Sequence, residues 1–202
     1  MSPKYIAIEG NIGAGKTTLS KLLAKQLNAR LVLEEFEENP FLSKFYKDPK
    51  RYAFSVEMAF LADRYHQLNQ IQLTEDLFQP MVISDYAPFK SLIFAQNNLS
   101  EEEFNLYREF WKMALGKLRQ PDLILYLNRP LDSLQQNIRK RGRDYEMNLE
   151  SSYLEKLSER YAFYLKNQWS GKMFYIDADE WDFIENPKSL EAFILRYLPD
   201  IM

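Results

Sequence analysis

The strongest constraint on the fold is a glycine-rich segment, which reads Gly10-Asn11-Ile12-Gly13-Ala14-Gly15-Lys16-Thr17. It fits the pattern G-x-x-x-x-G-K-S/T, in which backbone N–H groups surround the phosphates of a nucleotide. An apolar run of strand length, residues 5–9, precedes it, and leucines at helical spacing follow it over residues 18–27. We therefore expect a strand, a P-loop and a helix in direct succession, with the start of the helix facing a bound anion.

The loop also carries the side chains that nucleotide binding needs. Lys16 is placed to neutralise the β- and γ-phosphates, and the Thr17 hydroxyl to ligate Mg²⁺. The alternative is a turn that only connects a strand to a helix. Since three of the six glycines of the chain fall here with Lys-Thr in register, the sequence favours an ATP-binding segment that runs from Gly10 to Thr18.

Length and composition narrow the class of protein. A chain of 202 residues with 46% hydrophobic residues is expected to form one domain over residues 1–202. Its net charge of −3 provides no general attraction for nucleic acid, and it contains no cysteine. No signal peptide and no apolar run of membrane-spanning length is found, so we expect a cytoplasmic protein without a nucleic-acid or membrane partner.

Short apolar runs alternate with helical patterns along the chain. The predicted strands are 5–9, 30–33, 81–85, 123–127 and 173–177, and the predicted helices are 18–27, 52–73, 101–118, 131–141, 152–169 and 187–198. Ser100 and Glu103 form a capping box before one of these helices. This order predicts an α/β fold of the P-loop NTPase type, with a five-stranded parallel sheet flanked by helices. Ligands of such sheets bind beyond the carboxyl ends of the strands.

Carboxylates follow two of these strand ends. The run 81–85 is apolar and ends in Asp85, which is expected to hold Mg²⁺ directly or through water. Residues 34–38 contain four acids, one of which could accept the proton of an attacking hydroxyl. The alternatives are a solvated strand end for Asp85 and a solvated acidic loop for residues 34–38.

A basic cluster follows the helix predicted at 131–141 and reads Arg139-Lys140-Arg141-Gly142-Arg143. Guanidinium groups stabilise charge on a transferring phosphoryl group. The alternative is a basic helix end that complements the helix dipole. Because Gly142 stands between two arginines, we favour a flexible Arg-rich lid over about residues 139–150.

Together these elements predict phosphoryl transfer from a nucleoside triphosphate. A regulatory GTPase would need an N-K-x-D element for guanine, and the sequence has none. A compact kinase of a small substrate is the better interpretation.

Five stretches of the chain resemble the deoxyribonucleoside kinases, and within them the bacterial deoxyguanosine kinase type. They are IEGNIGAGKTTL at 8–19, EEFEENPFLSKFYKDPKRYAF at 34–54, VEMAFLADRYHQL at 56–68, ISDYAPFKSLIFA at 83–95 and RKRGRDYE at 139–146. The resemblance extends from about residue 4 to about residue 183. The acidic stretch before Asn-Pro and the spacing Arg-Gly-Arg-x-x-Glu separate this group from other P-loop proteins.

The resemblance implies roles for particular residues. Glu34 matches the general base that accepts the proton of the sugar 5′-OH. Tyr46 and Glu146 match the pair that holds the 3′-OH, and Arg141 and Arg143 match lid arginines that bind the donor phosphates and act in catalysis.

Further positions match the metal and base sites of the family. Thr17 and Asp85 match the positions around Mg²⁺, and Phe94 matches an aromatic that stacks on the base. Arg64 matches an arginine that contacts purines, and Glu57 matches a position, usually Gln, that meets the Watson–Crick edge. A homodimer is implied as well.

Glu57 carries a specific expectation about the base. An ionised carboxylate only accepts hydrogen bonds, and guanine offers two adjacent donors, N1–H and N2–H₂. Adenine and cytosine offer one donor beside an acceptor, and a buried mismatch costs about 1–3 kcal/mol. Arg64, seven residues along the same predicted helix, is placed to donate to guanine O6. The alternative is a plain Glu57 on a helix face, paired with Arg64.

Two positions depart from the family pattern. Where many relatives carry an arginine near the 5′-OH, this chain has Tyr86, and Lys90, Arg139 or a lid arginine could substitute. A second arginine of relatives falls on Asn137, and Arg139 could take over its contact with ATP.

The expected activity is an ATP- and Mg²⁺-dependent kinase for the 5′-OH of a purine deoxynucleoside, chiefly deoxyguanosine, in nucleotide salvage. The alternatives are a deoxyadenosine or broader deoxynucleoside kinase, a nucleoside monophosphate kinase such as thymidylate kinase, and a nucleotide-binding regulator without turnover. The absence of a cation at Tyr86 argues against a monophosphate acceptor.

Overall fold

The computed structural model describes residues 3–35, 39–73, 81–147, 149–183 and 186–199. Within them one parallel sheet has the strand order β2-β3-β1-β4-β5. Its strands are β1 (Tyr5–Gly10), β2 (Arg30–Val32), β3 (Val82–Ser84), β4 (Leu123–Asn128) and β5 (Lys172–Asp177). The predicted five-stranded parallel sheet is confirmed, with strand ends that differ from the prediction by at most one residue.

Helices connect the strands. They are α1 (Lys16–Gln26), α2 (Leu42–Lys47), α3 (Pro49–Leu73), α4 (Lys90–Asn98), α5 (Glu101–Ala114), α6 (Leu131–Arg141), α7 (Ser151–Asn167) and α8 (Pro187–Tyr197), with short 3₁₀ turns η1 (Asp144–Glu146) and η2 (Ala178–Glu180). The capping box at the start of α5 is present, since the Ser100 hydroxyl accepts from the Glu103 N–H and the Glu103 carboxylate accepts from the Ser100 N–H.

Three helices differ most from the sequence prediction. The six residues of α2 are too few to show a helical period, and the sequence does not predict it. The helix α4 is also missing from the prediction, because its buried face includes Lys90 and Ser91 and therefore lacks a continuous apolar stripe. The helix α5 ends at Ala114 rather than at residue 118, where the chain turns through Gly116.

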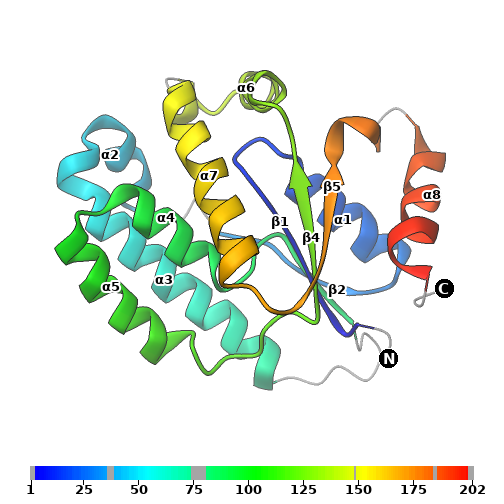
Figure 1. Ribbon diagram of the computed structural model, residues 1–202, viewed down its shortest axis with the longest axis horizontal. Coiled ribbons are helices and arrows are strands. Elements are labelled where there is room, and N and C mark those ends of the chain that lie inside the picture. The colour runs from blue at the N-terminus through cyan, green and yellow to red at the C-terminus, as the bar shows by residue number, and fades with distance from the viewer. Residues whose placement is uncertain (1–2, 36–38, 74–80, 148, 184–185, 200–202) are drawn as a thin grey trace.

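The sheet lies between two layers of helices (Figure 1). Alternate residues of β1 face opposite layers: Tyr5 and Ala7 belong to the core on the side of α3, α4, α5 and α7, whereas Ile6 and Ile8 pack with α1 and α8. All four are fully buried. Burial on both faces explains why the strands appear in the sequence as continuous apolar runs.

The P-loop follows β1 and packs closely against α6. Gly13 has φ +83°, and a Cβ atom there would lie 2.6 Å from the carbonyl oxygen of Leu134 in α6. Gly15, at the start of α1, also has a positive φ of +96°, but a Cβ atom would meet nothing within 4 Å. Glycine is therefore needed for different reasons at the two positions. At Gly13 it allows the loop to approach α6 closely, and at Gly15 it only allows a positive φ.

No helix in the part of the chain described here is both long and apolar enough to cross a bilayer.

We expect Gly13→Ala to destabilise the protein more than Gly15→Ala. Both substitutions impose a left-handed conformation on alanine, which costs about 1–2 kcal/mol. Only Gly13→Ala also forces α6 away from the loop. Urea unfolding of the two variants without nucleotide measures the difference, and equal losses of stability would contradict the contact between the loop and α6.

Candidate active site

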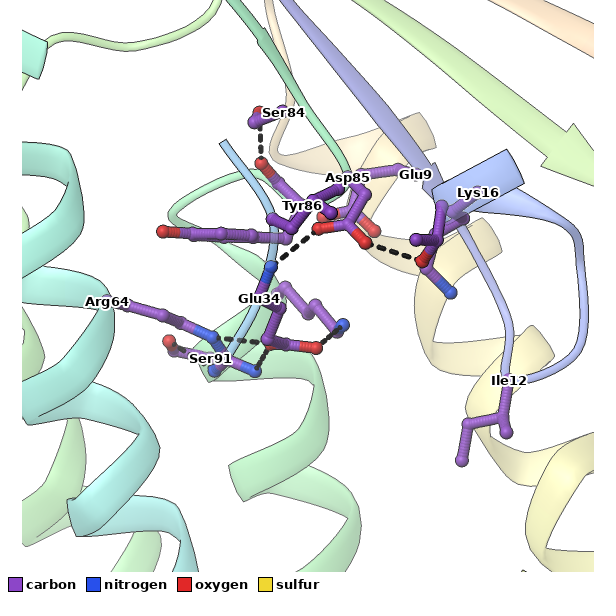
Figure 2. Close-up of polar contacts among 12 residues, drawn as sticks. Glu9, Ile12, Lys16, Glu34, Arg64, Ser84, Asp85, Tyr86 and Ser91 are labelled. Carbon is purple, nitrogen blue, oxygen red and sulfur yellow. Dashed lines mark hydrogen bonds and ion pairs between the residues drawn. The ribbon is translucent and has the colours of Figure 1, made fainter. Parts of the chain in front are cut away.

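Asp85 joins the carboxyl ends of three strands. It lies directly after β3 and is 5% exposed. Its Oδ2 accepts a hydrogen bond from the Thr17 hydroxyl at 2.6 Å, and its Oδ1 accepts from the Glu34 backbone N–H at 2.8 Å (Figure 2). Asp85 thereby connects the helix after the P-loop to the chain that leaves β2, and it places two oxygen atoms beside the phosphate-binding loop.

Lys16 folds back on its own loop. Its Nζ donates to the carbonyl oxygens of Gly10 at 2.9 Å and Asn11 at 2.8 Å. Burial, and then the charge of Lys90, lower the pKa of Lys16 to about 8, against the opposing effect of nearby carboxylates. A cation that is buried in this way gains from an added anion, which is the condition expected of a phosphate-binding lysine.

Glu34 is held between two cations. Its Oε1 accepts hydrogen bonds from Arg64 Nε at 3.0 Å and from Arg64 Nη2 at 2.5 Å (Figure 2). Its Oε2 accepts a hydrogen bond from Lys90 Nζ at 2.5 Å. Burial acts to raise the pKa of Glu34, but Lys90 and Arg64 outweigh it and lower the pKa to about 2. Glu34 is therefore ionised throughout the neutral range.

Lys90 is one of the residues suggested by the sequence as a substitute for the arginine that relatives carry at Tyr86. The structure places its ammonium group on Glu34 and 5.4 Å from the ring centre of Phe94. The side chain of Tyr86 instead donates a hydrogen bond to Gln67 Oε1 at 2.6 Å. A cation from α4 thus stands beside the acid that is expected to meet the 5′-OH.

Arg64 is buried on α3 and does not pair directly with Glu57. Besides Glu34, it donates through Nη1 to the Ser91 hydroxyl at 2.7 Å. Its guanidinium also lies over the rings of Phe60, at 5.0 Å, and Tyr86, at 5.9 Å. The expected contact of Arg64 with a purine stays a prediction, whereas its contact with Glu34 is a finding that the sequence did not indicate.

Glu57 is a buried carboxylate with an incomplete set of partners. It is 2% exposed, and its Oε1 accepts from Asn98 Nδ2 at 2.7 Å. Its Oε2 has no hydrogen-bond partner among the described residues. Burial is the main reason that the pKa of Glu57 rises to about 7; Arg64 and the Asn98 hydrogen bond oppose this rise and Glu34 adds to it.

The residues predicted to hold the sugar lie together beside the lid. Glu146 forms ion pairs with Arg141 and, at 3.3 Å, with Arg143. Tyr46, on α2, stacks on Tyr145 with the ring centres 5.4 Å apart. The unpredicted helix α2 therefore matters to the site, because it carries Tyr46 toward the lid.

Two cavities meet at the P-loop. All seven predicted substrate-binding residues line the first cavity: Glu34, Tyr46, Glu57, Arg64, Asp85, Phe94 and Glu146. The second cavity is lined by residues 13–18 of the P-loop, by lid residues and by Trp181, Asp182 and Phe183. Both cavities include Lys16, Thr17, Arg141 and Arg143, so the predicted phosphate-binding groups lie where a donor and an acceptor would meet.

Some predicted ATP-binding residues lie elsewhere. Gly10 and Asn11 line neither of these two cavities: the Gly10 carbonyl binds Lys16, and the Asn11 amide donates to Leu154 O and Ser158 Oγ of α7. Arg139 is exposed and lines neither cavity, whereas Lys140 lines the second. This geometry therefore does not support the expectation that Arg139 substitutes for the arginines that relatives carry at the positions of Tyr86 and Asn137.

Asn137 and Arg129 line the second cavity instead. Asn137 Nδ2 donates to the carbonyl of Gly13 at 2.8 Å, and Arg129 Nε donates to the carbonyl of Ala14 at 3.1 Å. Arg129 directly follows β4, as Asp85 directly follows β3. This position at a strand end is the sequence signal that could have identified Arg129 as a site residue.

Glu9 is a buried acid that sequence reasoning assigned only to a strand. Its Oε1 accepts from the Ala87 N–H at 2.6 Å, and its Oε2 accepts from the Tyr161 hydroxyl at 2.9 Å. Burial raises the pKa of Glu9. The side chain connects β1 to the loop after β3 and to α7, directly behind the P-loop.

Comparison with known proteins identifies the family of this chain. The sequence model of the family described as deoxynucleoside kinase matches residues 6–198. This chain belongs to the deoxynucleoside kinase family. It is a phosphotransferase with the α/β fold of P-loop kinases, as the sequence predicted, and a regulator without turnover is no longer an alternative.

Relatives of this kinase differ in the base they are named for. The chain is 38% identical over 195 residues to a deoxyguanosine kinase of Bacillus subtilis, covering 93% of this chain and 92% of the relative. It is 34% identical over 164 residues to a deoxyadenosine kinase of Dictyostelium discoideum, covering 81% and 67%. A solved deoxyadenosine kinase from M. mycoides matches with a TM-score of 0.80 and 30% identity, covering 95% and 97%. Similarity alone therefore leaves the choice of purine open.

We expect Glu57→Gln to stabilise the unliganded kinase more at pH 8 than at pH 5. The pKa of Glu57 is raised from 4.5 to about 7 on folding. The folded state then binds the proton more tightly, so the contribution of Glu57 to stability is fully present below pH 4.5 and is lost as the pH rises through 7, by on the order of 3 kcal/mol. Glutamine removes this loss.

Urea unfolding at the two pH values measures the effect. Glu35→Gln, at an exposed neighbour of the active-site Glu34, is the control and should leave the pH dependence unchanged. A gain from Glu57→Gln that is the same at both pH values would show that Glu57 does not titrate in this range.

Proposed function

We propose that this kinase transfers the γ-phosphoryl group of ATP to the 5′-OH of a purine deoxynucleoside in nucleotide salvage, with deoxyguanosine as the preferred acceptor. The observation that carries the choice of base is the Glu57 carboxylate, buried in the first cavity with one oxygen lacking a partner among the described residues. The orphaned oxygen has a cost in free energy unless a ligand donates to it.

Guanine supplies what this carboxylate lacks. Oε1 already accepts from Asn98 and retains capacity for a second donor, and Oε2 is free to accept another. The adjacent N1–H and N2–H₂ groups of guanine can meet both oxygens, whereas adenine would turn its N1 lone pair toward one of them. Phe94, which lines the same cavity, provides a ring on which the base can stack.

On the acceptor side we assign the 5′-OH to Glu34. Its ionised carboxylate can accept a hydrogen bond from the hydroxyl and take its proton late in the transfer. A carboxylate held by two cations is a weak base, but phosphoryl transfer depends chiefly on positioning and on stabilisation of charge. Tyr46 and Glu146 are assigned to the 3′-OH, which fixes the sugar relative to Glu34.

On the donor side we assign the phosphates to the P-loop, Lys16, Arg141 and Arg143. Bound Mg²⁺ would neutralise charge on the phosphates, and the oxygens of Thr17 and Asp85 fit the hard oxygen ligands that this ion prefers. Since Arg141 and Arg143 are paired with Glu146 in the structure, phosphate and Glu146 would compete for them. Residues from about 139 to 150 would act as the lid.

Three further expectations from the sequence stay predictions: a single domain over residues 1–202, a cytoplasmic location and a homodimer. The exposed apolar side chains of Leu106, Phe110 and Met113 on α5 favour association between copies of the chain. Deoxyadenosine remains the alternative acceptor, favoured by the similarity to kinases named for it.

We expect deoxyguanosine to be the best acceptor in an ATP-dependent assay of a deoxynucleoside panel at pH 8. Glu57→Gln should lower kcat/KM for deoxyguanosine by about tenfold or more and raise it for deoxyadenosine, because glutamine presents one donor and one acceptor. Coupled measurement of ADP release gives both values. A wild type that prefers deoxyadenosine or a pyrimidine would overturn the choice of base and leave the kinase activity intact.

We expect Glu34→Gln to reduce kcat by about 10²–10⁴-fold, the range for loss of a positioned proton acceptor. Glu35→Gln is a matched control, because the adjacent Glu35 is exposed and should retain wild-type activity. Steady-state kinetics with saturating ATP measures both variants. Near-normal turnover by Glu34→Gln would remove Glu34 from the catalytic role.

A further inference from the structure

Glu34 and Glu57, two of the carboxylates that line the first cavity, have contrasting partners. Glu34 receives hydrogen bonds from two cations. Glu57 receives one, from the neutral amide of Asn98, and Arg64 directs its described hydrogen bonds to Glu34 and Ser91. A buried carboxylate without an ion pair is poorly stabilised in its charged form. Both its ionised and its neutral forms are therefore accessible near neutral pH.

Titratable side chains face Glu57 from several of the elements packed around it. They are Arg64 on α3, Glu34 after β2, Lys90 on α4, Tyr107 on α5 and Tyr153 on α7, with Arg141, Arg143 and Glu146 lining the same cavity. The pKa of Glu57 is raised to about 7 by burial, with Glu34 adding to the rise and Arg64 and Lys90 opposing it. Burial raises the pKa values of Tyr107 and Tyr153, so both stay neutral.

We propose that the protonation state of Glu57 selects the purine: the ionised carboxylate binds guanine and the neutral carboxylic acid binds adenine. The inference rests on the proposed role of Glu57 as the residue that reads the base. It makes deoxyguanosine and deoxyadenosine the substrates of two protonation states of one pocket.

The hydrogen-bonding groups of the bases account for this selection. A carboxylate is acceptor only and matches the two adjacent donors of guanine. A carboxylic acid has one donor and one acceptor, and it matches N1 and the N6 amino group of adenine. The Asn98 amide keeps an acceptor at Oε1 in both states, which places the proton on Oε2, the oxygen that has no partner among the described residues.

Proton balance follows directly. Guanine that binds to the neutral acid releases one proton to solvent, and adenine that binds to the ionised form takes one proton up. The ratio of kcat/KM for deoxyguanosine over deoxyadenosine should then rise with pH by up to about tenfold per pH unit, in proportion to the ratio of ionised to neutral Glu57.

The test is a competition assay of the wild-type kinase with both purine deoxynucleosides in one mixture, at several values from pH 6 to pH 8. Because both substrates share the 5′-OH chemistry and the donor, titration of every other catalytic group cancels in the ratio. We expect the ratio to rise about tenfold or more across this range. In Glu57→Gln, which does not titrate, it should stay constant within about twofold and favour deoxyadenosine.

A binding measurement on the wild type alone covers the case in which Glu57→Gln does not fold. Calorimetric titrations at pH 7 in buffers of different ionisation enthalpy should show proton release with deoxyguanosine and proton uptake with deoxyadenosine. A flat ratio together with equal proton linkage for both purines would overturn the selection by protonation. If the ratio changes with pH but deoxyadenosine wins even at pH 8, the selection stands and the proposed preference for deoxyguanosine fails.

Discussion

The arrangement of the site depends on the two hydrogen bonds that Asp85 accepts. One comes from the Thr17 hydroxyl and the other from the Glu34 backbone, so a single buried carboxylate sets the distance between the P-loop helix and the acid after β2. Parallel strands bring their carboxyl ends to one edge of the sheet, but they do not fix the loops that follow. Asp85 supplies that constraint where the first and second cavities meet. Glu9 adds to it through its hydrogen bonds with the Ala87 N–H and the Tyr161 hydroxyl.

Local patterns in the sequence were sufficient to predict the sheet and the place of the P-loop within it. Five buried strands produce apolar runs, and the P-loop pattern in this context is specific for phosphate binding, so the fold class and the position of Lys16 and Thr17 could be predicted. Most of the predicted substrate-binding residues came from the resemblance to a family, and only Asp85 and the acids of residues 34–38 were indicated by strand ends. All seven line one cavity in the structure, although they come from segments that are far apart in the chain.

What the sequence could not provide is the pairing of side chains across elements. The resemblance assigns Arg64 to the purine, but the structure shows it bonded to Glu34, a residue on a distant segment of the chain. The short α2 lacks a helical period, and α4 hides its pattern by burying Lys90 and Ser91. Both polar side chains are buried because they have partners in the tertiary structure, Glu34 for Lys90 and Arg64 for Ser91, which no local pattern reveals.

The same tertiary pairing explains why two carboxylates in one cavity have such different pKa values. Arg64 and Lys90 both bond to Glu34 and hold its pKa at about 2. Glu57 lies on the same helix as Arg64 but receives a hydrogen bond only from the Asn98 amide within the described part of the chain, and burial raises its pKa to about 7. Buried ion pairs contribute little to net stability, so the benefit of the Glu34 cluster lies in fixing the charge of the acid that we assign to the acceptor hydroxyl. Because Arg64 and Lys90 both pair with Glu34 rather than with Glu57, the Glu57 carboxyl group can change its protonation state near neutral pH. Divergent pKa values of neighbouring acids commonly mark a division of roles, and here they fit the proposed division between phosphoryl transfer at Glu34 and base recognition at Glu57.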